Sequence, residues 1–231
     1  DNHSSGILAS GNGVNLTASE VWVSGTQLNS GEFNGFGVNA QLGASLSMSR
    51  SRVLNNHSAG ISALSGAMVE VSEVWASGTQ LDGRGLLGYG VAAGSGASLS
   101  VSRSYLSDNH TVAVAFFESG GSVTESLLES TKFGGNLLGD GLMATGSVVT
   151  VDRIISRDNA RAGVLFNESD GELSKSLITQ NAVGLANQGL PGAAISEDNV
   201  IEGNDQDRLD DGDLEVPDEA MLLPSLPGSG G

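Results

Sequence analysis

The sequence predicts an all-β solenoid, a right-handed parallel β-helix of about eight coils with three short strands in each coil. Residues 43–57 (GASLSMSRSRVLNNH) return at 96–110 as GASLSVSRSYLSDNH, and self-similarity at a fixed period is typical of solenoids. Within each repeat, apolar residues alternate with Ser, Thr and Glu, which indicates half-buried strands rather than helices. Gly supplies 34 of 231 residues and aromatic residues only 4%, which suits narrow coils packed in thin layers.

The coils can be aligned on a reference residue, which is Glu20 in the first coil and Arg50 in the second. Small or apolar residues lie four and two positions before it and again three positions after it. For all of them to face inward, the chain must bend at the reference residue, between a first and a second strand. The column four positions before reads Leu16, Leu46, Val69, Leu99, Gly121, Val149, Gly171 and Ala194. The column two positions before reads Ala18, Met48, Val71, Val101, Val123, Val151, Leu173 and Ser196. The column after the bend reads Val23, Val53, Ala76, Leu106, Leu128, Ser156, Ile178 and Ile201.

A turn follows six positions after the reference residue, where Thr and Asn occur. The asparagines of this column are Asn56, Asn109, Asn159 and Asn181, followed by Asn204 in the last coil. Asn bonds to local backbone and tolerates left-handed conformations, and stacked Asn side chains can bond from coil to coil. A third strand then begins with a small and an apolar residue, as in Gly37-Val38 and Gly90-Val91.

Gly-rich excursions lengthen alternate coils at residues 27–35, 80–88 and 132–139. All three leave the same corner, so we expect them to line one edge of the column. We expect residues 1–204 to form the β-helix and residues 205–231, which are acidic and then rich in Pro, Gly and Ser, to form a C-terminal cap and a partly flexible tail. The chain opens inside a repeat, so we expect further coils or a cap upstream in the natural protein.

From residue 1 to about 204 the repeats resemble the parallel β-helix repeats of the pectate-lyase-like superfamily. The resemblance is to the architecture, and no catalytic motif of a particular enzyme family is matched. It implies that lyases of the fold gather acidic residues for calcium beside a basic proton acceptor, whereas hydrolases use two or three close Asp. The only stretch that could hold such a site carries Asp152, Asp158 and Asp170 with Arg153, Arg157 and Arg161.

The reference residues alternate in charge along the stack. They read Glu20, Arg50, Glu73, Arg103, Glu125 and Arg153. Neighbouring coils stack about 4.8 Å apart, so each Arg is expected between two carboxylates. We interpret the column as a structural ladder on the outer bend that controls the register of the coils, because exposed ion pairs add only about 0–1 kcal/mol of stability each. The alternative interpretation is an ion-binding groove.

A second outward column carries Trp22, Arg52, Trp75 and Tyr105, two positions after the reference residue. An exposed file that holds both tryptophans is unexpected on a monomer. It is the candidate ligand-binding face, able to stack sugar rings or bury against a partner. The alternative is that the excursions or neighbouring Arg stems fold over it.

Two residue sets raise the question of a metal site. His3, His57 and His110 recur on every second coil, about 9–10 Å apart, so they cannot share a zinc ion. The acidic tail offers weak calcium candidates in Asp207, Asp211, Asp213 and Asp218. Leu209 falls where a calcium loop needs a ligand, and the closing residue is not Glu, so a solvated acidic linker is the favoured alternative. We expect no cofactor, with calcium as the one exception.

The charge and composition of the chain narrow the range of functions that it could have. A net charge of −17 argues against nucleic acids and anionic membranes as partners, and no apolar run approaches a membrane span. The chain has no cysteine, so it has neither disulfides nor a thiol nucleophile. We predict a non-catalytic, extracellular or cell-surface module that serves as a stalk, an adhesin or a scaffold for binding a glycan or a protein surface, with self-association open. The alternative is a secreted polysaccharide lyase or glycoside hydrolase.

Overall fold

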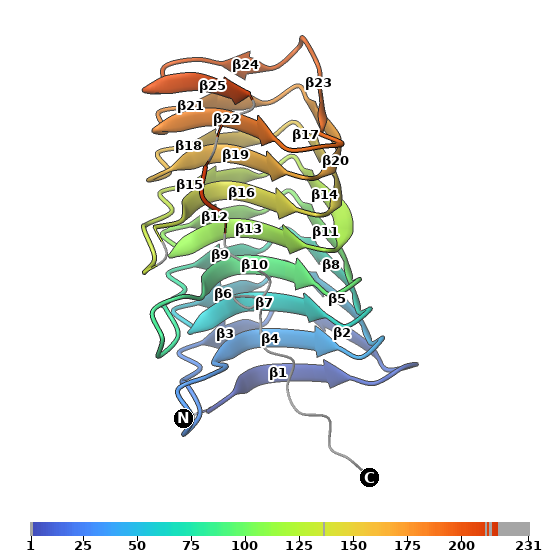
Figure 1. The fold of residues 1–231 in the computed structure, drawn as a ribbon. Coiled ribbons are helices and arrows are strands. Elements are labelled where there is room, and N and C mark those ends of the chain that lie inside the picture. The colour runs from blue at the N-terminus through green and yellow to red at the C-terminus, as the bar shows by residue number, and fades with distance from the viewer. Residues whose placement is uncertain (1, 136, 211, 213, 217–231) are drawn as a thin grey trace.

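The computed structural model describes residues 2–135, 137–210, 212 and 214–216. They form a right-handed parallel β-helix, as predicted, in which each coil gives one strand to each of three parallel sheets (Figure 1). Strands of successive coils lie next to one another in sequence order, so the chain advances one rung per coil. No helix in the described part of the chain is long and apolar enough to cross a membrane.

The long-strand sheet has nine strands. In spatial order they are β1 (Ser5–Ser10), β4 (Phe36–Gln41), β7 (Ser58–Leu64), β10 (Gly88–Gly94), β13 (Thr111–Phe117), β16 (Gly139–Thr145), β19 (Ala162–Asn167), β22 (Val183–Gln188) and β25 (Gln206–Asp210). The last of these lies beyond residue 204 and pairs in parallel with β22.

The other two sheets have eight strands each. The middle sheet contains β2 (Asn15–Ser19), β5 (Ser45–Ser49), β8 (Met68–Ser72), β11 (Ser98–Ser102), β14 (Gly120–Thr124), β17 (Val148–Asp152), β20 (Asp170–Ser174) and β23 (Ala194–Ile195). The short-strand sheet contains β3 (Trp22–Ser24), β6 (Arg52–Leu54), β9 (Trp75–Ser77), β12 (Tyr105–Ser107), β15 (Leu127–Glu129), β18 (Ile155–Arg157), β21 (Leu177–Thr179) and β24 (Val200–Ile201).

The bend between the middle and short-strand sheets lies at the reference residues, as predicted. All six residues of the charge ladder have positive φ, from 45° at Arg50 and Arg103 to 58° at Glu20. This left-handed conformation turns the chain within one residue, so columns on both sides of the bend face inward. The backbone N–H of Glu20 donates to Ser49 O of the next coil at 3.1 Å, so the bend keeps its place in the ladder of backbone hydrogen bonds.

One continuous core runs through the column and contains the three predicted inward columns almost throughout. The last coil is an exception. Leu173 pairs with Ile195 rather than with Ser196, and Ala193 lies in the core while Ala194 is exposed. The predicted register is wrong by one residue here, because Ile195 and Val200 lie five positions apart where Leu173 and Leu177 lie four apart.

Two glycines replace apolar residues in the inward column of the middle sheet. Gly121 has φ of 150° and Gly171 has φ of 132°, a region of backbone conformation that side chains rarely adopt. A Cβ on Gly121 would lie 1.8 Å from Leu99 O, and a Cβ on Gly171 would lie 1.9 Å from Val149 O. At both rungs the backbone itself therefore fills the space of the missing side chain.

The three excursions leave the corner between the short-strand and long-strand sheets, as predicted, and contact one another across the intervening short coils. Gly83 N donates to Glu32 O at 3.0 Å, and Gly135 N donates to Gly85 O at 2.8 Å. The guanidinium of Arg84 lies 5.2 Å from the ring centroid of Phe33. The excursions thus form a second, coarser stack along one edge of the column.

Candidate functional site

The candidate face is the outer surface of the short-strand sheet. Trp22 pairs with Arg52, Arg52 with Trp75, and Trp75 with Tyr105, so four successive coils place these side chains in one file. Each is the first residue of a three-residue strand whose middle residue is buried in the core. Strand alternation therefore turns the whole file outward, as predicted.

Within this file, the side chains contact one another along the column. The guanidinium carbon of Arg52 lies 5.9 Å from the ring centroid of Trp22 and 5.5 Å from that of Trp75. The rings of Trp75 and Tyr105 stack at 6.0 Å with an interplanar angle of 25°. Trp22 stays 67% exposed and Trp75 38%, so the guanidinium of Arg52 lies beside both rings and leaves both of them exposed.

Arg52 differs from every other cation of the chain. Of the ten Lys and Arg residues, all within the described part of the chain, nine have a carboxylate oxygen within 4.0 Å. Arg52 has no carboxylate partner among the described residues and instead lies between two indole rings. Arg52 is exposed, and no carboxylate among the described residues occupies its guanidinium, so its N–H donors are available to a ligand.

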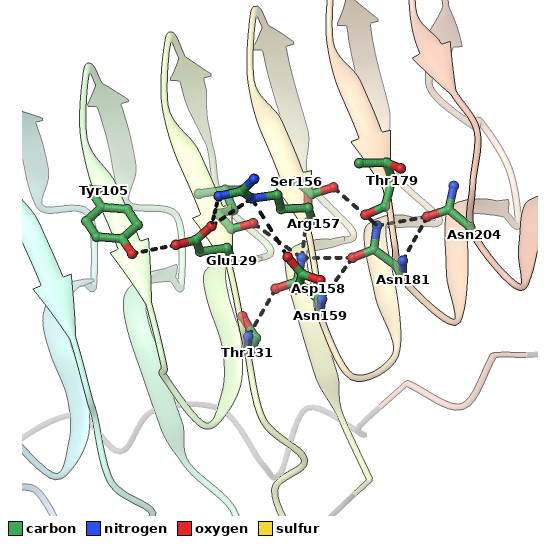
Figure 2. Close-up of polar contacts among 11 residues, drawn as sticks. Tyr105, Glu129, Thr131, Ser156, Arg157, Asp158, Asn159, Thr179, Asn181 and Asn204 are labelled. Atoms are coloured by element: carbon green, nitrogen blue, oxygen red, sulfur yellow. Dashed lines mark hydrogen bonds and ion pairs between the residues drawn. The ribbon is translucent and has the colours of Figure 1, made fainter.

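The file continues into an ion pair that the sequence analysis did not identify. Tyr105 Oη donates to Glu129 Oε1 at 2.5 Å, and Arg157 donates to Glu129 Oε2 from Nε at 2.8 Å (Figure 2). Glu129 and Arg157 are paired last residues of β15 and β18. The sequence signal for this ion pair is the opposite charge of Glu129 and Arg157 in one outward column. The link from Glu129 to Tyr105 runs diagonally between two columns, so a column-by-column alignment does not reveal it.

These contacts change the acidity of Glu129. Burial raises the pKa of the carboxyl, but the hydrogen bond from Tyr105 and the hydrogen bond and charge of Arg157 outweigh it, so the net pKa is lowered. The hydrogen bond to Glu129 is in turn the main reason that the pKa of the Tyr105 phenol is raised. The pair therefore holds Tyr105 protonated and fixes its ring at the end of the file.

The pH dependence of stability is expected to report this contact. A carboxyl whose pKa is lower in the folded state stabilises the fold above its unfolded pKa of about 4.5 and loses that contribution as the pH falls through the folded pKa. The free energy of unfolding of the unmodified protein should therefore fall more steeply below pH 4.5 than that of Glu129→Gln, as urea denaturation at several pH values would measure. Tyr105→Phe should give an intermediate slope. Identical slopes for all three proteins would contradict the assignment.

The charge ladder forms two runs of ion pairs. Arg50 pairs with Glu20 at 3.3 Å, and Arg103 lies 3.5 Å from Glu73 and 4.0 Å from Glu125. Arg153 continues the second run, 3.2 Å from Glu125. All these side chains are about half exposed or more, so each pair adds only about 0–1 kcal/mol, which agrees with a role in register rather than in overall stability.

The Asn column forms a buried ladder of hydrogen bonds. Asn159 Nδ2 donates to Asn181 Oδ1, and Asn181 Nδ2 donates to Asn204 Oδ1, both at 3.0 Å (Figure 2). The side-chain oxygens of Asn56 and Asn109 accept the backbone N–H groups of Thr26 and Thr79 in the preceding coils. These residues therefore stabilise the turn and do not face a ligand.

Among the described residues, no group of three or more His, Asp or Glu side chains is placed to hold a metal ion. His3, His57 and His110 each bond through Nδ1 to a backbone carbonyl of the excursion corner. Asp207 Oδ1 accepts the N–H and Nδ2 of Asn204. The other calcium candidates, Asp211, Asp213 and Asp218, lie outside the described residues.

The stretch considered for catalysis places its carboxylates on different elements with different partners. Asp152 ends β17 and pairs with Arg153 at 2.5 Å, while Asp158 follows β18 and lies 3.8 Å from Arg157. Asp170 begins β20 and accepts the N–H of Gly171. Arg161 belongs to another contact, a buried bidentate pair with Asp140.

No protein-family model and no curated protein matches this chain. The candidate function therefore depends on the geometry of the file. That geometry offers flat apolar rings, one cation that has no counter-ion in the described part of the chain, and one rung every 4.8 Å or so.

Proposed function

We propose that this β-helix is a non-catalytic binding scaffold that works outside the cell or at its surface and presents the file of Trp22, Arg52, Trp75 and Tyr105 to a glycan. The observation that carries the proposal is the pairing of exposed aromatic rings with the one cation that has no carboxylate partner among the described residues. Aromatic faces stack on the apolar faces of sugar rings, and a guanidinium donates to hydroxyl or carboxylate oxygens. The parallel stack of rungs supports the proposal because it holds the four side chains at fixed spacing before a ligand arrives.

The double variant Trp22→Ala/Trp75→Ala is expected to weaken glycan binding about 30-fold, because each ring contributes roughly 1 kcal/mol. A glycan array would identify the ligand, and titration calorimetry would measure the loss. Met68→Ala/Val148→Ala is the matched control, since both side chains are as exposed but lie on the middle sheet. Undiminished binding by the tryptophan variant, or equal loss in the control, would contradict the proposed face.

The part of the proposal that says the protein is non-catalytic has its own test. Incubation of the protein with the glycans that it binds should release neither unsaturated nor reducing sugar ends. Release of either product would overturn this part and favour the polysaccharide lyase or glycoside hydrolase alternative.

A further inference from the structure

The guanidinium of Arg52 lies in the middle of the file with its hydrogen-bond donors unused. Its carbon lies 5.9 Å from the ring centroid of Trp22 and 5.5 Å from that of Trp75, and the residue is exposed. No residue of the described ranges accepts a hydrogen bond from this side chain. A guanidinium presents its N–H donors in a planar fork, which a carboxylate or sulfate group fills with two anionic oxygens at once. A single hydroxyl oxygen leaves most of the fork empty.

The carboxylates of the bends on either side of Arg52 are already paired. Glu20 lies two positions before Trp22 and contacts Arg50 at 3.3 Å, and Glu73 lies two positions before Trp75 and contacts Arg103 at 3.5 Å. On the short-strand sheet itself, the strands β3, β6 and β9 contain no acidic residue. An anionic group that approaches Arg52 therefore meets no unpaired carboxylate from these strands or from the bends that precede them.

The negative charge of the chain is concentrated in coils beyond the file. Residues 2–107, which contain the whole file, include five acidic and four basic residues, whereas residues 108–210 include sixteen and six. The first acidic residue of the short-strand sheet is Glu129 on β15, three rung steps or about 14 Å from β6. Exposed charges at that separation are largely screened, because the Debye length is about 8 Å at physiological ionic strength. The net charge of −17 therefore opposes a polyanion along the whole column but not one anionic group at Arg52.

Taking the file as a glycan-binding face, as proposed above, we infer that its ligand is an anionic glycan and that Arg52 determines this specificity. Arg52 binds a carboxylate or sulfate group of one sugar residue, and the indole rings of Trp22 and Trp75 stack on the sugar faces beside it. The file contains a single cation, so a second anionic group on the same stretch of glycan would have no partner. The file therefore matches a glycan that alternates anionic and neutral sugars better than a uniformly charged one.

The test uses an array of matched oligosaccharides that alternate glucuronate with N-acetylglucosamine. Each sequence is present with its carboxyls intact, with these carboxyls reduced to alcohols, and in the reduced form with sulfate esters added. The full chain should bind the carboxylated or the sulfated form at least about tenfold more tightly than the reduced form, because a charge-assisted hydrogen bond is roughly twice as strong as a neutral one. The form that binds most tightly identifies the anionic group.

Arg52→Gln removes the charge at an exposed position and keeps an amide donor. Its affinity for the anionic form should fall about tenfold, whereas its affinity for the reduced form should change less than about twofold. Arg208→Gln is the matched control, because it removes the same charge from an exposed residue of β25, on the last strand of the long-strand sheet, and should change neither affinity. Both affinities are measured by titration calorimetry on one preparation of each variant, so their ratio does not depend on the folded fraction.

The failure of this inference is distinguishable from the failure of glycan binding. If the reduced form binds as tightly as the anionic forms and loses affinity in Trp22→Ala/Trp75→Ala, the file binds glycans without selecting charge, and only the inference is overturned. An equal loss in Arg52→Gln and Arg208→Gln would also overturn it, because the selectivity would then come from the net charge. If no form binds, the proposed function fails and the inference fails with it.

Discussion

Replacing Gly121 with valine is expected to destabilise the protein by at least about 3 kcal/mol, although the repeat pattern favours valine there. Leu99 precedes Gly121 in the inward column and Val149 follows it, so an average over the repeats would recommend the change. The structure predicts the opposite, because Gly121 has φ of 150° and an added Cβ would lie 1.8 Å from Leu99 O. Backbone strain and overpacking each cost about 1–3 kcal/mol at such a site.

Gly120→Ala is the matched control, because the neighbouring glycine has an ordinary backbone conformation and its Cβ would lie 3.3 Å from Val148 O. We expect a change of at most about 1 kcal/mol from it. Thermal and urea denaturation of both variants measure the difference. A Gly121→Val protein as stable as the unmodified one would show that this rung does not have the backbone conformation described above.

Replacing Asn159 with alanine is expected to cost about 3–5 kcal/mol. The buried side chain accepts from Thr131 N at 3.2 Å and donates to Leu128 O at 3.3 Å, Ser156 Oγ at 3.1 Å and Asn181 Oδ1 at 3.0 Å. Alanine leaves several of these buried groups without a partner, and each such group costs about 1–3 kcal/mol before water or relaxation compensates.

Asn15→Ala serves as the control for this variant, since Asn15 is exposed and bonds only locally, to Gly13 O at 3.2 Å. Its effect should stay within about 0.5 kcal/mol. Urea denaturation gives both values. If the two asparagine variants were equally stable, the turn ladder would not be the stabilising element that its hydrogen bonds indicate.

The architecture was predictable because each rung must place its apolar side chains directly above those of the previous rung. Because of that requirement, Val and Leu recur at fixed positions in the sequence. Inward columns lie on both sides of Glu20 and Arg50, and this arrangement predicts the bend at those residues. The prediction became wrong where the repeat loses its regularity, at Ala194 and Ser196, because one extra residue before Val200 shifts the register.

The candidate face was predictable in outline for the same reason. Trp22 and Trp75 occupy one outward column, and strand alternation determines where that column points. The sequence did not reveal that Arg52 has no carboxylate partner within the described ranges, since that depends on the partners of every other cation. It also did not reveal the link from Tyr105 to Glu129, which crosses columns.

The excursions occur on every second coil, whereas the aromatic file has a member on every coil from Trp22 to Tyr105. The edge that carries the aromatic file therefore presents one side chain of the file about every 4.8 Å, and the edge that carries the excursions presents one excursion about every 9.6 Å. A polymeric ligand whose chemical unit matches the finer spacing could contact successive members of the file but would meet the excursions only at alternate units. Two ligands of different repeat length could thus be distinguished by the same column, each along its own edge.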